Sequence, residues 1–307
     1  MTTTHEHESN IRELKMQAES HIAASIEVAP IQAIGSPELP GLFPRGTSVY
    51  ITDMGHDTAE TLAAAARRVR DLGYAPVPHF ACRRLGSRAA LEKRIRMAAE
   101  EAGVTDVLVV GGGLDKPAGD FTSTMEVLET GLFDKYGIRQ MGVAGHPEGS
   151  PDFSESVAIE ALRLKKNFGE RTDAKIRIVT QFGFDAEKFI NWSEALRENG
   201  IDLPVHLGIA GPAKVTTLIK FAAICGIGNS VAFLRKNMAS LTTLTTSHSP
   251  EAIIRPIEQH VLANPASAIR QVHVFPFGGL KKASEWLVER GTWDLASPFP
   301  SINRVAN

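Results

Sequence analysis

Short apolar runs alternate with helix-like segments along most of the chain. Several runs are continuously apolar, which is typical of parallel strands covered by helices. The segments between them begin with capping residues: one follows Asp57-Thr-Ala-Glu60, one runs from Ser87 to Gly103, and one follows Asp185. The pattern therefore predicts strands joined by helices. The predicted strands are Ser25–Ala29, Ser48–Thr52, Pro76–Phe80, Asp106–Gly111, Gln140–Ala144, Lys175–Phe182, Val205–Ala210 and Gln271–Phe277.

This alternation predicts an α/β protein with one (β/α)₈ TIM barrel over residues 21–307, preceded by a polar N-terminal extension at 1–20. A doubly wound open sheet is the competing architecture. Such a sheet normally carries a Gly-x-Gly-x-x-Gly turn after its first strand, and none occurs here. The connection at about 31–45 is too rich in Pro and Gly for a long helix, whereas 226–264 is expected to hold an extra helix.

Composition and charge exclude several classes of protein. The net charge of -2 gives no overall attraction to nucleic acid or anionic lipid. No apolar run approaches the roughly 20 residues needed to span a bilayer. Residues 1–10 are polar and unlike a signal peptide, and the two cysteines form neither a disulfide framework nor a zinc pattern. We therefore expect a cytoplasmic protein without nucleic-acid or membrane partners.

Polar residues at the C-terminal ends of the strands are the candidates for an active site, because barrel enzymes build their sites there. Glu27 stands in Ile-Glu-Val-Ala-Pro at the end of the first strand. Burial among apolar neighbours favours the protonated form of a carboxyl group, which a general acid requires. A single glutamate of this kind is more often a solvated strand-end carboxylate or an ion-pair partner. Glu27 becomes a candidate acid only together with the other strand ends.

Other strand ends carry groups suited to a flat or anionic ligand. Gly111-Gly112-Gly113 lets a ligand approach the backbone, although a flexible turn is the simpler interpretation. Gln181 can donate and accept hydrogen bonds at once, which suits the edge of a pterin or nicotinamide; the alternative is an amide bonded to local backbone. No histidine spacing typical of a metal site occurs, so no metal is expected. The remaining candidates are Thr52, His79, Asp115, His146, Lys165, Lys166 and Phe182.

These segments together resemble the methylenetetrahydrofolate reductase family over about residues 20–290. The most specific match is Thr180–Asp185, which is similar to the family's Thr-Gln-x-Phe-Phe-Asp. Ser25–Pro30 resembles Phe-Glu-Phe-Phe-Pro-Pro, and Pro78–Cys82 resembles Pro-His-Leu-Thr-Cys. Three shorter segments also match. They are Leu164–Lys166 with Leu-Lys-x-Lys, His146–Glu148 with Tyr-Pro-Glu, and Leu207–Ile209 with Pro-Gly-Ile.

The resemblance implies a flavin-containing barrel that reduces 5,10-methylenetetrahydrofolate to 5-methyltetrahydrofolate, or catalyses the reverse oxidation. NADH or NADPH would reduce FAD and leave before the folate binds. Glu27 would be the proton donor. The implied cofactor contacts are Thr52, His79, Gly111, Gly112, Gly113, Asp115, His146, Lys165 and Lys166. The implied substrate contacts are Gln181, Phe182 and Lys281.

Three strand ends differ from the family pattern. After the fifth strand, His146 stands where the family has a tyrosine. The fourth strand ends Gly111–Asp115 where the family has Arg-Gly-Asp, and Lys281 stands for an arginine after the last strand. A reductase that passes hydride directly from the nicotinamide, without flavin, is therefore an alternative. A pterin-dependent methyltransferase barrel and a non-catalytic folate-binding protein are two more. The former would need a thiol or cobalamin partner, and the latter would not need Glu27. The sequence is compatible with a homo-oligomer.

Overall fold

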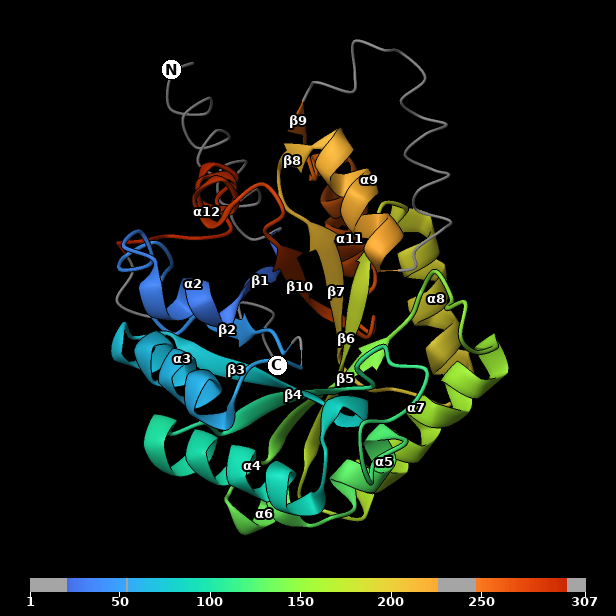
Figure 1. Cartoon of the computed structure of the whole chain (residues 1–307). Coiled ribbons are helices and arrows are strands. Elements are labelled where there is room, and N and C mark those ends of the chain that lie inside the picture. Colours follow the sequence, from blue (N-terminus) through green and yellow to red (C-terminus); the bar gives the residue numbers. More distant parts are fainter. Residues whose placement is uncertain (1–20, 54, 226–246, 297–307) are drawn as a thin grey trace, which may run out of the picture.

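The long strands of the chain close into a parallel barrel (Figure 1). The computed structural model describes residues 21–53, 55–225 and 247–296, so the predicted extension at 1–20 lies outside the described residues. The strands follow the order β1-β10-β7-β6-β5-β4-β3-β2, and β2 pairs with β1. The predicted (β/α)₈ barrel is confirmed. Its strands are β1 (Ala23–Val28), β2 (Ser48–Ile51), β3 (Ala75–Ala81), β4 (Asp106–Val110), β5 (Gln140–Gly145), β6 (Lys175–Gly183), β7 (Val205–Ala210) and β10 (Ile269–Phe275).

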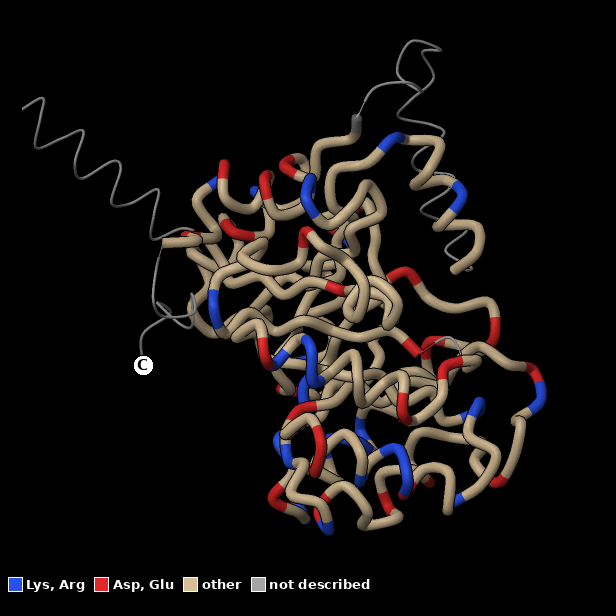
Figure 2. Tube along the Cα trace, turned by 60° about the vertical axis from the view of Figure 1, so that its left-hand side comes forward, with Lys and Arg blue, Asp and Glu red and all other residues tan. Residues whose placement is uncertain are grey.

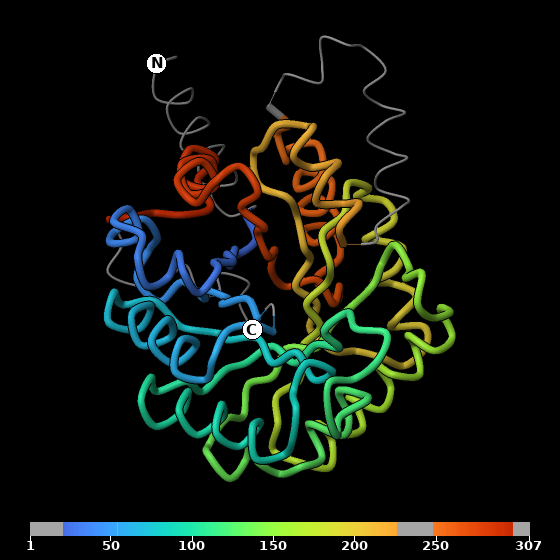
Figure 3. Tube along the Cα trace, in the orientation of Figure 1, coloured from blue at the N-terminus to red at the C-terminus, as the bar shows by residue number. Residues whose placement is uncertain are grey.

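Helices surround the barrel and connect successive strands (Figures 1 and 3). A short antiparallel hairpin, β8 (Ala213–Lys214) with β9 (Ser247–His248), interrupts the alternation after β7. The extra helix expected before the last strand is α11, while 226–246 lie outside the described residues. The helices are α2 (Pro30–Gly35), α3 (Ala59–Asp71), α4 (Arg88–Ala102), α5 (Thr124–Leu128), α6 (Leu132–Lys135), α7 (Glu155–Glu170), α8 (Ala186–Glu198), α9 (Val215–Ile224), α11 (Glu251–Ala263) and α12 (Leu280–Glu289), with a 3-10 turn at Cys82–Arg84.

Side-chain caps fix where several helices begin. Ser87 Oγ accepts from the amide of Ala90 at the start of α4, and α4 ends at Gly103 in the left-handed conformation. Asp185 caps α8 in the same way, as predicted. The expected capping box at 57–60 was displaced by one residue. The cap of α3 is Thr58, because its side chain accepts from the amide of Thr61 at 3.1 Å.

The apolar core of the described residues forms three separate clusters, the smallest of which consists of Ala59, Ala63 and Met97 on α3 and α4. The largest cluster lies between the strands and the helices and includes Ile26, Val49 and Val109. A small cluster lies apart from it and includes Tyr50 and Val179. Ser25 pairs in register with His273, and Glu27 with Tyr50, so each pair faces the same side of the sheet. Ser25, His273, Glu27 and Tyr50 therefore place their polar groups on the same side of the barrel wall.

The surface carries mixed charge. Acidic and basic residues are interspersed along the trace in the view of Figure 2, in keeping with the net charge of -2. Over the described residues, no helix is both long enough and apolar enough to cross a membrane.

Candidate active site at the barrel mouth

Glu27 lies near the C-terminal end of β1, between two imidazoles. Its Oε2 is 3.7 Å from Nε2 of His79 on β3 and 3.7 Å from Nε2 of His273 on β10. Within the described part of the chain, both Nε2 atoms are buried and have no hydrogen-bond partner. The Glu27 side chain is 17% exposed, so a ligand at the barrel mouth can reach it. The structure thus brings two predicted residues together and adds His273, which the sequence analysis did not single out.

Ser25 holds His273 from the other side of the ring. Its Oγ is 3.0 Å from Nδ1 of His273 and 3.4 Å from the carbonyl oxygen of Val272. If Ser25 donates to this carbonyl, it accepts from Nδ1–H, and Nε2 is free to take a proton. If Ser25 donates to Nδ1, Nε2 carries the proton. Nδ1 therefore has Ser25 as a partner in either tautomer of His273, while Nε2 faces Glu27.

Gln181 is positioned by an irregularity in β6. Val179 pairs with His206 on β7, but the next pair is Phe182 with Gly208, so β6 has one more residue than β7 over this interval. The Gln181 Oε1 atom accepts from the amide of Phe182 at 3.1 Å. The amide oxygen is thus bonded locally, as the simpler interpretation expected. No described residue accepts a hydrogen bond from its Nε2, which leaves a donor at the half-buried end of β6.

The glycine loop after β4 borders open space. A Cβ atom added to Gly111 or Gly113 would meet no described atom within 4 Å. Gly112 has φ of +99° and packs against Ala81, so a side chain there would be strained. The exposed Asp115 is tied to the neighbouring loop through its backbone carbonyl, which accepts from Arg83 at 2.7 Å. Thr52 is half-buried directly after β2.

Lys165 is a buried lysine on the inner face of α7, 7% exposed. Burial lowers the pKa of its ammonium to about 8. Burial also lowers the pKa of His146 to about 4, and the charge of Lys165 adds to this effect. Burial raises the pKa of Cys82 and the Lys165 charge opposes this rise, so the charge acts on groups that follow both β3 and β5. Two of the predicted cofactor contacts, Lys165 and His146, are therefore coupled electrostatically.

Three other predicted site residues make contacts that do not involve Glu27. Lys166 bonds to Glu170, and its Nζ lies 3.7 Å from Asp202, which precedes β7. Phe182 is 1% exposed and packs among aromatic rings, with the ring centre of Phe277 4.7 Å away. Lys281 is 63% exposed and lies 4.0 Å from Glu285. Their surroundings are those of a surface ion pair, a core residue and a solvated lysine, respectively.

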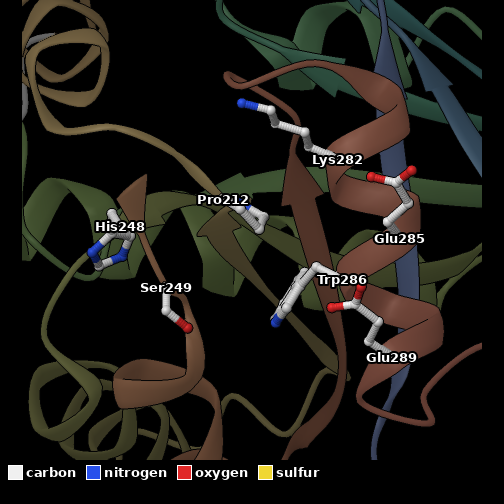
Figure 4. A pocket seen from close by; sticks show the side chains of 7 residues that line it. All are labelled: Pro212, His248, Ser249, Lys282, Glu285, Trp286 and Glu289. Atoms are coloured by element: carbon white, nitrogen blue, oxygen red, sulfur yellow. The ribbon is translucent and has the colours of Figure 1, made fainter. Parts of the chain in front are cut away.

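A pocket of about 250 Å³ lies beside the barrel, between the β9 hairpin strand and α12 (Figure 4). Lys282 lines it, whereas Lys281 does not. None of the residues around Glu27 contributes to it, so we treat it as separate from the candidate active site. The lining residues are Pro212, His248, Ser249, Lys282, Glu285, Trp286 and Glu289.

The described residues contain no group of three or more His, Cys, Asp or Glu arranged to hold a metal ion, and Glu27 with its two imidazoles is not such a group. Cys82 is fully buried and donates to the carbonyl of Gly111 at 3.4 Å. Burial raises its pKa to about 11, so it is a thiol rather than a thiolate near neutral pH.

The buried histidines predict a loss of stability in mild acid. Burial lowers the pKa of His79, of His146 to about 4, and of His206 well below 6.5; Arg177 adds to the effect on His206. The unfolded chain takes up these protons near pH 6.5, whereas the folded chain does so only at lower pH. Stability is therefore complete above about pH 6.5 and falls as the pH approaches the folded-state values, by up to about 1.4 kcal/mol per pH unit for each histidine.

Urea unfolding at about pH 7.5 and about pH 5.5 measures this loss. The His206→Gln variant should show a shallower pH dependence than wild type, because one of the unprotonated imidazoles is gone. An equal dependence in both proteins would show that His206 does not contribute.

Comparisons of the sequence with known proteins point to one family. The family profile for methylenetetrahydrofolate reductase matches residues 39–252. Methylenetetrahydrofolate reductase 1 of Schizosaccharomyces pombe is 29% identical over 155 residues, which cover 49% of this chain and 24% of that protein. The 5,10-methylenetetrahydrofolate reductase of Pectobacterium carotovorum subsp. carotovorum is 27% identical over 165 residues, or 50% of each protein. The chain thus spans half or less of these relatives.

A solved structure has a similar fold. An uncharacterised protein from Clostridium thermocellum, which binds two copies of 5-methyl-5,6,7,8-tetrahydrofolic acid, has a TM-score of 0.54 at 12% identity. The likeness covers 91% of this chain and 98% of that one, and it supports the barrel fold. Since the profile match covers more than half of the sequence, the chain belongs to the methylenetetrahydrofolate reductase family.

Proposed function

We propose that this protein is a methylenetetrahydrofolate reductase that uses NADH or NADPH as the reductant and FAD as a bound cofactor. The product would be 5-methyltetrahydrofolate, and the same residues would serve the reverse oxidation. The observation that carries the proposal is the partly exposed Glu27 carboxyl group between two imidazoles whose Nε2 atoms have no hydrogen-bond partner among the described residues. Family membership supplies the substrate class.

The reaction needs an acid at this position. The methylene carbon of the substrate is held in a five-membered ring between two nitrogens. A proton delivered to the departing nitrogen breaks its bond to the methylene carbon, and an iminium ion remains on the other nitrogen. Hydride then adds to that carbon and forms the methyl group. Glu27 is the proton donor in this proposal, and general acid catalysis of this kind contributes about 10²–10⁴ in rate.

Glu27 must regain a proton after each turnover. The Nε2 atoms of His79 and His273, each 3.7 Å away, can approach hydrogen-bonding distance by small side-chain rotations. Ser25 satisfies either tautomer of His273, so the imidazole can give up and take a proton without losing its partner. The free donor of Gln181 is suited to orient the pterin ring or the nicotinamide.

The residues after β3, β4 and β5 fit a large anionic cofactor. The open space beside Gly111 and Gly113 would admit it, and Lys165 supplies a buried positive charge. That charge also acts on His146. When bound, FAD supplies hydride exchange between the nicotinamide and the folate. The chain's own groups bind the two substrates and move the proton.

A flavin-independent reductase is the second candidate. It is favoured by the fourth strand, where Gly111–Asp115 replaces Arg-Gly-Asp and Asp115 is exposed. Hydride would then pass directly from the nicotinamide to the folate. Glu27 would have the same function in both reactions.

The experiment is a visible spectrum of the purified protein together with an anaerobic assay of methylenetetrahydrofolate reduction by NADH and by NADPH. Oxidised-flavin bands with folate reduction support the first proposal, and reduction without bands supports the second. A protein that reduces no folate with either nucleotide contradicts both.

Lys165 and Lys166 provide a sharp test of the cofactor site. In Lys165→Met we expect FAD to bind about tenfold more weakly or worse, because a buried positive charge that would attract the anionic cofactor is lost. Lys166→Met should bind FAD like wild type, since its ammonium pairs with Glu170 and lies near Asp202. Titration of flavin-free protein with FAD, followed by fluorescence quenching, measures both. Equal weakening in the two variants would contradict the placement of Lys165.

A further inference from the structure

A charged network lies in the barrel near Glu27. Arg177 on β6 is buried, and its Nη1 is 2.8 Å from Asp106 Oδ1 on β4. Arg177 also donates to the Tyr50 hydroxyl oxygen from Nε at 3.2 Å and from Nη2 at 2.8 Å. Layers of branched apolar residues usually fill this kind of barrel. Burying an ion pair costs several kcal/mol per ion, and apolar replacements are often as stable or more stable. Stability alone therefore does not account for the network.

Tyr50 connects this network to both imidazoles of the candidate site. The centre of its ring is 4.3 Å from that of His273 and 6.0 Å from that of His79. Its oxygen is fixed by two hydrogen bonds, and its ring is fully buried against Val77, Leu108 and Val179. These contacts hold the Tyr50 ring in place. The Tyr50 ring is therefore a fixed surface against which the imidazoles of His79 and His273 pack.

His273 is held between two fixed groups. Ser25 binds Nδ1 at 3.0 Å, and the Tyr50 ring covers the imidazole. With these contacts in place, Nε2 faces Glu27 at 3.7 Å. Without the Tyr50 ring in this position, the His273 imidazole could rotate about its side-chain bonds, and Nε2 would move away from the Glu27 carboxylate.

We propose that Tyr50, fixed by the Arg177–Asp106 pair, is a positioning residue that keeps His273 Nε2 directed at Glu27. This inference rests on the proposed function, in which Glu27 donates the proton and His273 helps to restore it. The hydroxyl group of Tyr50 is what fixes the ring. Without it, the two Arg177 donors would lose their acceptor and the ring would lose its hydrogen bonds to Arg177.

The test compares Tyr50→Phe with Tyr74→Phe. Tyr74 is also buried, and its hydroxyl donates to the carbonyl of Leu39 at 2.8 Å, in the large core cluster rather than in the cluster of Tyr50. Both variants lose a buried hydroxyl, so a general loss of stability should affect them alike. Only Tyr50→Phe should lower kcat for folate reduction, by about tenfold or more, with the folate KM within about twofold of wild type.

A second measurement does not depend on activity. Nitrogen NMR of histidine-labelled protein, with the His273 signals assigned by their loss in His273→Gln, reports the tautomer and surroundings of the ring. We expect the His273 signals to shift in Tyr50→Phe and to stay in place in Tyr74→Phe. Unmoved signals with kcat within about twofold of wild type would overturn the inference. If wild type reduces no folate, the proposed function fails, and the NMR comparison still decides whether Tyr50 positions His273.

Discussion

Replacing Glu27 by Gln should reduce folate reduction by about 10²–10⁴. Glutamine has nearly the same shape and keeps an oxygen and a polar nitrogen between His79 and His273, so the fold and the ligand contacts should survive. It has no proton of suitable acidity to give to the departing nitrogen of the substrate. The loss should therefore fall on the step that opens the folate ring.

Stopped-flow measurement of the two half-reactions separates this step from the rest. Reduction of bound flavin by NADH or NADPH needs no proton from Glu27 and should keep its wild-type rate. Reoxidation by methylenetetrahydrofolate should show the full loss. Glu38→Gln, at an exposed position, is the matched control and should resemble wild type in both. An equal loss in both half-reactions would show that Glu27 serves binding or folding rather than proton donation.

The barrel was predictable because its strands are buried and apolar. All eight predicted strands overlap the observed ones, since their residues contact the core that the helices cover. The β8–β9 hairpin was not predicted. Each of its strands has two residues, which is too short for any periodic pattern.

The site was only partly predictable, because its residues meet through long-range pairing. Glu27 and His79 end apolar runs and were visible as candidates. His273 lies inside a run, between Val272 and Val274, where a histidine reads as part of a strand. Its contact with Ser25 depends on the pairing of β10 with β1, which closes the barrel between the two ends of the chain. The local sequence does not show that β1 and β10 pair.

One distinction could have been drawn from the sequence. Leu162, Lys165 and Phe168 recur every third residue and form the buried face of α7, as helical periodicity requires. Lys166 is one position further round the helix and falls off that face. The family resemblance implies a cofactor contact for both lysines, whereas the helical period places only Lys165 on the buried face of α7.

Replacing Gly208 by Ala should destabilise the protein by about 1–3 kcal/mol or more, the usual cost of overpacking a core. A Cβ atom at Gly208 would lie 2.5 Å from the Thr180 carbonyl oxygen and 2.7 Å from the Gln181 carbonyl carbon. Both are backbone atoms of the irregular part of β6, so no side-chain rotation can relieve the clash. The amide of Gly208 also donates to Thr180 Oγ1 at 2.8 Å, and moving the strands apart would lengthen this bond.

The same clash should also affect the candidate active site, because Gln181 lies in the irregular part of β6. We expect a lower urea midpoint for Gly208→Ala and, in protein that is still folded, a raised KM for folate. Gly35→Ala is the control, since a Cβ there meets no described atom within 4 Å and φ is not positive. Its stability should stay within about 0.5 kcal/mol of wild type. If Gly208→Ala is as stable as Gly35→Ala and binds folate normally, β6 is not held against β7 at this point, and the position of Gln181 has another cause.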